Sequence, residues 1–193
     1  NSTPQLYDVN KDGKLDLVVG ERAGTLNYYE NTGTPSAPAF NLVTSSFGNV
    51  LVNNIYSLYG YSYPFMYDSA GTTQLLVGAV NGYIYQYNNI DNNLLGNFNL
   101  VDSMYQGIYE PQRITVASRD INGDGIREIL TGNYAGGLTL YAFDSTTSIQ
   151  EAIQQEAAFQ LYPNPAADYI MIRIDETARP AMREIRIVDI TGR

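Results

Sequence analysis

Short apolar runs that end in glycine recur three times along the chain, and each is followed, after three intervening residues, by a second glycine. The runs are residues 17–20 (LVVG), 75–78 (LLVG) and 129–132 (ILTG), and the second glycines are Gly24, Gly82 and Gly136. A run of this length is too short for a helix and is typical of a strand buried on both faces. The pattern predicts three equivalent strands, each leading into a tight turn.

The segments around these runs predict the rest of a repeating unit. Residues 83–87 (YIYQY) alternate with a period of two, as a strand does, and the glycines before such strands tolerate the positive φ of a hairpin turn. The tetrapeptide FNLV occurs at residues 40–43 and again at 98–101, at the same offset of 58 positions that separates Gly20 from Gly78. The third unit has no counterpart of this tetrapeptide.

A unit of roughly 55 residues with four short antiparallel strands is typical of a β-propeller blade and not of a solenoid coil. The predicted fold class is therefore all-β, a partial β-propeller of about three four-stranded blades over residues 1–145. Propellers close with about four to eight blades, so three blades leave open edges. We expect further blades upstream; a compact partial propeller and closure by another chain are the alternatives.

The composition changes after residue 145. Residues 146–158 are rich in Gln, Glu and Ala, and Ser148 and Glu151 have the spacing of a helix capping box. We interpret this segment as a linker with a short helix, or alternatively as a flexible linker. Beyond it, residues 161–165 (LYPNP) predict a rigid extended turn, and residues 169–174 and 185–190 predict two further strands.

Charge and composition restrict the chemistry. The formal charge of −9 and the pI of about 4.3 argue against nucleic acid as a partner, because phosphate binding needs clustered Lys and Arg. The chain has neither Cys nor His, which removes thiol nucleophiles, imidazole bases and the common zinc ligands. No apolar run reaches the ~20 residues that a membrane-spanning helix needs. Chemistry based on oxygen ligands is what remains.

Two loops carry such ligands, because both have the pattern D-x-N-x-D-G-x-x-[DE] at equivalent places in the first and third units. Alternate side chains of a tightly turned loop converge on one point, and Ca²⁺ takes about 6–8 oxygen ligands. The predicted ligands are Asp8, Asn10, Asp12, Asp16 and the carbonyl of Lys14 in the first loop, and Asp120, Asn122, Asp124, Glu128 and the carbonyl of Ile126 in the third. The alternative is a solvated acidic turn that holds no ion.

The pattern differs from an EF-hand loop, which needs an acidic residue at position twelve. Val19 and Thr131 stand there, and strand-forming residues surround them. The second unit keeps Asp68, but its loop is two residues shorter and ends at Gln74, so we expect no calcium there. The sequence thus predicts two calcium sites as the only cofactors.

The first loop and the residues after it, LVVG and then Gly24-Thr25-Leu26 with 29–33 (YENTG), resemble the FG-GAP or VCBS repeat. That family forms β-propellers, including the integrin α-subunit head, with calcium in the loop between the first two strands of a blade. The resemblance covers about residues 4–144 and implies calcium at the ten residues named above. Glu128 departs from the usual Asp, which implies a difference in geometry or affinity at the second site.

The C-terminal stretch, residues 159–193, resembles the C-terminal sorting domain of the Bacteroidetes type IX secretion system, through residues 161–166 (LYPNPA) and 187–193 (IVDITGR). Such domains are small β-sandwiches, of which this chain holds the beginning. The resemblance implies the type IX machinery as a partner and a location outside the cell or on the outer-membrane surface. The alternative is that the Tyr-Pro-Asn-Pro segment is only a turn between domains.

No recognisable catalytic set is present, since no pair of carboxylates, phosphate-binding loop or Ser/His/Asp triad can be assigned. We therefore expect a non-catalytic calcium-binding propeller that binds glycans or extracellular proteins in an adhesion-like role. An accessory propeller of a polysaccharide-degrading enzyme with its catalytic domain upstream is one alternative, and a structural spacer is the other. The 17 tyrosines fit either packing between blades or stacking on sugars.

Overall fold

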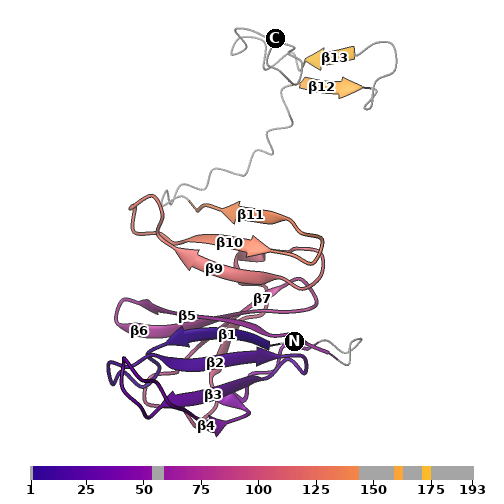
Figure 1. Ribbon diagram of the computed structural model, residues 1–193. Helices are drawn as coiled ribbons and strands as arrows, with labels where there is room; N and C mark the ends of the chain where they lie inside the picture. The colour runs from indigo at the N-terminus through magenta and orange to yellow at the C-terminus, as the bar shows by residue number, and fades with distance from the viewer. Residues whose placement is uncertain (1, 54–58, 144–158, 163–170, 175–193) are drawn as a thin grey trace. The chain divides into compact units, whose positions relative to one another are not determined.

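The computed structural model describes residues 2–53 and 59–143, together with the backbone of 159–162 and 171–174 (Figure 1). By its internal contacts the chain divides into two compact units, residues 1–145 and 146–193. The first unit contains three successive antiparallel sheets. Sheets 1 and 2 have four strands each, and sheet 3 has three described strands.

Each sheet is a meander in which strands that follow one another in sequence pair with one another. Sheet 1 consists of β1 (Ser2–Tyr7), β2 (Asp16–Glu21), β3 (Leu26–Asn31) and β4 (Phe40–Thr44). Sheet 2 consists of β5 (Tyr63–Ser69), β6 (Thr72–Gly78), β7 (Ile84–Asn88) and β8 (Asn99–Asp102). Sheet 3 consists of β9 (Thr115–Arg119), β10 (Glu128–Gly132) and β11 (Leu138–Tyr141). The only helical elements among the described residues are two 3₁₀ turns, Phe47–Asn49 and Tyr105–Gly107. The prediction of an all-β chain of antiparallel sheets is confirmed.

The three glycine-terminated runs occupy the same place in their sheets. Gly20 pairs with Leu26, Gly78 with Ile84, and Gly132 with Leu138. The glycines of the turns between these strands have φ of 90°, 85° and 91°, in the left-handed region that favours glycine. The predicted hairpins therefore form with one common register.

Apolar residues on both faces of sheet 2 join the three sheets. One cluster contains Val18, Leu26 and Tyr28 of sheet 1 with Leu75 and Val77 of sheet 2. A second cluster contains Leu76 and Ile84 of sheet 2 with Ile129 of sheet 3. The first strands β1, β5 and β9 lie next to one another in sequence order, as Figure 1 shows for the three sheets. The buried run LLVG of sheet 2 thus points alternately toward sheet 1, through Leu75 and Val77, and toward sheet 3, through Leu76.

In the second unit, β12 (Phe159–Tyr162) pairs with β13 (Met171–Ile174) as a two-stranded antiparallel sheet. The predicted strand over 169–174 therefore exists, in a shorter form. The predicted linker helix at 146–158 and the strand at 185–190 lie outside the described residues. Within the part of the chain that the structure describes, no helix has the length and apolar character needed to cross a membrane.

Candidate metal centre

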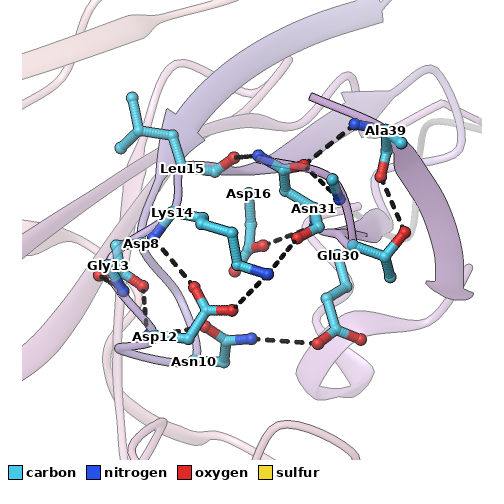
Figure 2. Close-up of polar contacts among 12 residues, drawn as sticks. Asp8, Asn10, Asp12, Gly13, Lys14, Leu15, Asp16, Glu30, Asn31 and Ala39 are labelled. Carbon is cyan, nitrogen blue, oxygen red and sulfur yellow. Dashed lines mark hydrogen bonds and ion pairs between the residues drawn. The ribbon is translucent and has the colours of Figure 1, made fainter. Parts of the chain in front are cut away.

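The first acidic loop, residues 8–15, connects β1 to β2 and is folded around its own carboxylates (Figure 2). Asp8 accepts hydrogen bonds from the backbone N–H groups of Asp12 and Gly13, both at 3.0 Å. Asn10 Oδ1 accepts from the N–H of Asp12 at 3.0 Å, and Asp12 Oδ1 accepts from the N–H of Lys14 at 2.9 Å. Lys11 and Gly13 have φ of 59° and 86°, and these two left-handed residues allow the tight turn.

The third-unit loop, between β9 and β10, repeats these contacts. Asp120 Oδ2 accepts from the N–H of Gly125 at 3.0 Å, as Asp8 does from Gly13. Asn122 Oδ1 accepts from the N–H of Asp124 at 2.9 Å, and Asp124 Oδ1 accepts from the N–H of Ile126 at 2.7 Å. Asp120 Oδ1 differs, because it accepts from Gly123 at 2.6 Å. Both loops therefore present the side chains at positions one, three and five on the same backbone frame.

At the base of the first loop, the carboxylate of Asp16 is fully buried and its two oxygens are both occupied. Oδ1 accepts from the N–H of Asn31 at 2.8 Å. Oδ2 accepts from the N–H of Val9 at 3.2 Å and from the Tyr28 hydroxyl at 3.1 Å. Burial and the adjacent Asp16 carboxylate raise the pKa of Tyr28, so its hydroxyl stays protonated and donates. Asp16 therefore has enough protein donors to be buried without a cation.

Glu128 takes the same position in the third loop but keeps one oxygen without a partner. Its side chain is 3% exposed, and Oε2 accepts from the N–H of Ile121 at 2.7 Å, the counterpart of the Val9 contact. The other oxygen, Oε1, is buried and has no hydrogen-bond donor. Such a group loses its hydration without compensation, at a cost of roughly 1–3 kcal/mol and more for a charged group. A bound cation at this oxygen would remove that cost.

In the first loop an ammonium group lies among the predicted ligands, whereas the basic residue of the third loop, Arg127, donates to Ser118. Lys14 Nζ lies 2.9 Å from Asp12 Oδ2 and donates to the carbonyl oxygen of Asn31 at 2.8 Å (Figure 2). The hydrogen bond between the two side chains lowers the pKa of Asp12 and raises that of Lys14. The residue at this position of the third loop is Ile126, and Asp124 Oδ2 instead accepts from the Asn122 amide at 3.0 Å.

Glu30, which sequence reasoning missed, also reaches the first loop. Its Oε1 accepts from the Asn10 side-chain amide at 3.2 Å, and Figure 2 shows it beside that loop. The register of β2 and β3 pairs Leu17 with Tyr29, which places Glu30 next to Asp16. That hairpin pairing, readable from the Gly20 and Gly24 pattern, is the signal that could have found it.

The predicted ligand residues thus lie together on their two loops, but they are not arranged as a finished metal site. Among the residues that the structure describes, no group of three acidic side chains is positioned to hold an ion as it stands. Asp8, Asp12, Asp120 and Asp124 accept from N–H groups of their own loops. Asp16 instead accepts mainly from residues of β3. In sheet 2 the corresponding connection is a two-residue turn, where Asp68 Oδ1 accepts from the N–H of Gly71 at 3.0 Å. The calcium assignment stays a prediction.

Comparison with known proteins gives one match. Residues 160–193 match the family model of the secretion system C-terminal sorting domain. No curated protein and no solved structure shows significant similarity to the chain. The match confirms the predicted sorting segment. The protein is therefore exported by type IX secretion, is either released or attached at the cell surface, and interacts with the type IX machinery through this segment.

Proposed function

We propose that residues 1–145 are a non-catalytic, calcium-binding propeller module of this exported protein, which binds a glycan or an extracellular protein. The observation that supports calcium most directly is the buried, unpartnered Oε1 of Glu128, at the base of a loop that holds three more oxygen-bearing side chains. The residues that would hold the ion there are those predicted from the sequence: Asp120, Asn122, Asp124, Glu128 and the carbonyl of Ile126. The chain's lack of His and Cys supports a hard cation with oxygen ligands.

The first loop is proposed as a weaker calcium site. An ion bound by Asp8, Asn10, Asp12, Asp16 and the Lys14 carbonyl has to displace the ammonium group of Lys14 from Asp12. Asp16 also accepts hydrogen bonds from three protein donors already. Bound calcium therefore stabilises the folded protein less at Asp16 than at Glu128. The two loops are thus expected to saturate at different calcium concentrations, the third loop first.

Thermal unfolding with calcium and with a chelator tests this proposal. Calcium at a hundredfold excess over Kd stabilises the folded state by about 2.7 kcal/mol. For a unit of this size that raises Tm by roughly 5–10 °C. Asp124→Ala should abolish most of the increase, and Asp12→Ala a smaller part. Asp68→Ala is the matched control, because Asp68 is an exposed acid at the end of β5, beside the corresponding turn of sheet 2. An equal Tm in calcium and in chelator would refute the calcium proposal.

A tyrosine–arginine row on the connections between sheets and on the β2–β3 and β10–β11 turns supports ligand binding. It consists of Arg22, Tyr59, Tyr61, Arg113 and Tyr134, and it lies at the end of the sheets opposite the acidic loops. The Arg22 guanidinium lies 3.6 Å from the centre of the Tyr59 ring, and that of Arg113 lies 4.1 Å from Tyr61 and 4.9 Å from Tyr134. Neither arginine forms an ion pair with a described carboxylate.

Such a row offers fixed N–H donors beside aromatic rings, which suits the hydroxyl groups and apolar C–H faces of a sugar. Binding of the full chain to immobilised neutral and acidic glycans, with Tyr134→Ala as the variant, tests this role. Tyr134 is 68% exposed, and Leu95→Ala, at 76% exposure outside the row, is the control. Binding that Tyr134→Ala weakens and Leu95→Ala leaves unchanged supports the module. Absence of binding to glycans and to extracellular proteins favours a spacer, and a catalytic domain found on the same polypeptide favours an accessory module.

A further inference from the structure

The end of the three sheets that carries the tyrosine–arginine row, which we call the row end, has a charge opposite to that of the chain. The net charge of the chain is −9. In the turns and connections at the row end, the only charged residues are Arg22, Arg113 and Glu110; these segments are residues 22–25, 45–62, 79–83, 103–114 and 133–137. Glu110 is buried and accepts hydrogen bonds from three side chains of sheet 3. The accessible charge in these segments is therefore that of the two arginines.

The guanidinium groups of the row are stacked on tyrosine rings, but their N–H donors are not used by the protein. Arg127, at the end of the acidic loops, shows the contrast. Its guanidinium also lies on a ring, 4.7 Å from the centre of Tyr67, yet it donates to Ser118 Oγ at 3.3 Å and to the Ser118 carbonyl at 2.6 Å. Arg22 and Arg113 have neither such a hydrogen bond nor an ion pair with any described residue. A guanidinium that stacks by its face keeps its donors at its edge, where a ligand can accept from them.

The backbone beneath the row is strained at two equivalent positions. Tyr61 and Arg113 each stand two residues before the first strand of a sheet, and their φ values are 49° and 52°. Large side chains are rare in this left-handed region, and such strain is typical of sites that bind a ligand. The N–H of Tyr61 donates to the Arg22 carbonyl at 3.2 Å, and that of Arg113 donates to the Val80 carbonyl at 3.1 Å. Each strained residue is therefore held by the turn of the preceding sheet.

Close backbone packing fixes the first connection further. A Cβ on Gly60 would lie 2.6 Å from the Cα of Gly24, and the N–H of Gly60 donates to the Arg22 carbonyl at 3.1 Å. The backbone that carries Arg22 and Tyr61 is thus held in one arrangement before any ligand binds. A ligand that meets groups already in place loses less free energy to ordering them.

We infer that the glycan bound by the tyrosine–arginine row is acidic, a uronate-containing polysaccharide whose carboxylates pair with Arg113 and Arg22. This inference rests on the proposed function, in which the row binds a glycan. A planar carboxylate fits the parallel N–H donors at the edge of a guanidinium, while the apolar C–H face of a sugar ring packs on a tyrosine beside it. The acidic loops at the opposite end repel a polyanion, so the charge distribution favours contact at the row end.

Binding of the full chain to oligosaccharides of galacturonate, mannuronate and guluronate, each beside its own methyl ester, tests the inference. The ester keeps the sugar rings and loses the charge. Chelator is present throughout, at a temperature well below the Tm measured in chelator, so that calcium cannot bridge the carboxylates to the acidic loops. At least one uronate should bind about tenfold or more tightly than its ester, because hydrogen bonds to a charged group are the stronger ones. Added salt should reduce this preference.

Variants of the row connect that preference to its arginines. Arg113→Gln should weaken binding of the uronate about tenfold or more and leave binding of the ester nearly unchanged. Arg119→Gln is the matched control, because it makes the same change in charge at the last residue of β9, at the end of the acidic loops, and should leave both affinities unchanged. Arg113→Gly keeps the inference testable if Arg113→Gln harms folding, since glycine adopts a φ of 52° without strain. It should lose the preference for the uronate and keep a far-ultraviolet spectrum like that of the wild type.

Oligoglutamate, which has the charge but no sugar ring, is the third probe and should bind about tenfold or more weakly than the uronate. Equal binding of uronates and esters would overturn this inference and leave glycan binding by the row intact, whereas binding of neither would overturn both. Equal binding of oligoglutamate, or a loss in Arg119→Gln as large as that in Arg113→Gln, would also overturn the inference, because charge alone would then account for the binding.

Discussion

The buried carboxylate of Asp16 should be a main contributor to the stability of the first sheet, and Asp16→Asn isolates that contribution. The side chain accepts three hydrogen bonds, from Val9, Tyr28 and Asn31, at 2.8–3.2 Å. A carboxamide has a single oxygen, so it can serve the N–H of Asn31 or that of Val9, but not both. Hydrogen bonds to charged groups contribute about 1.5–3 kcal/mol each, and a buried donor without an acceptor costs roughly 1–3 kcal/mol.

One of the three bonds is then lost, one is weakened by loss of the charge, and the Tyr28 hydroxyl can turn to accept from the new amide. Relief of the buried charge offsets part of the loss. The expected loss in the free energy of unfolding is about 3 kcal/mol. Urea unfolding followed by tyrosine fluorescence in chelator measures it without a contribution from metal. Asp68→Asn, which changes an exposed acid with one hydrogen bond, should cost less than about 1 kcal/mol. A loss at Asp16 no larger than this control would refute the reasoning.

Two further predictions concern the interfaces between sheets. Gly78→Ala should lower the free energy of unfolding by about 3 kcal/mol in a urea titration, because its Cβ overlaps the Ile114 carbonyl, and a loss below about 1 kcal/mol would contradict the close approach. Glu110 is buried, and hydrogen bonds from Thr139 and Asn133 lower its pKa below the ordinary 4.5. Its stabilising effect is therefore complete above that value and is lost as the pH falls through the lowered pKa. Melting curves from neutral to acid pH should give the wild type a higher Tm than Glu110→Gln near neutrality, and this difference in Tm should vanish in acid. A difference in Tm that stays constant with pH would contradict the lowered pKa of Glu110.

The strand order could be predicted because the signals are local. Glycine-terminated runs became β2, β6 and β10, and the two FNLV segments gave β4 and β8. A short apolar run bounded by glycine has few other ways to bury its side chains and satisfy its backbone. Once the sheets are known to stack, the period of two decides which of these residues face which interface.

The contacts of the candidate site could not be predicted in the same way, because they join residues far apart in the sequence. Lys14 was assigned only for its carbonyl, while its ammonium group pairs with Asp12 and with the Asn31 carbonyl, 17 positions away. Glu30 reaches Asn10 across 20 positions. Spacing within a loop shows which oxygens can converge, but not which charges from the next strand have entered the same space.

The difference between the two loops nevertheless has a cause that is visible in the sequence once the register is known. Tyr28 pairs with Val18 in sheet 1, and the residue in the same position of sheet 3 is Leu140, which pairs with Leu130. In sheet 1 the Tyr28 hydroxyl is one of the donors that satisfy Asp16, whereas a leucine in its place offers Glu128 no hydrogen bond. Tyr28 therefore donates to Asp16 the kind of hydrogen bond that Glu128 Oε1 lacks, and the leucine in the same position of sheet 3, Leu140, is 55% exposed. The residue at this one position, Tyr28 or Leu140, thus makes the first loop less dependent on a cation than the third. This difference is the physical basis for expecting the third loop to bind calcium first.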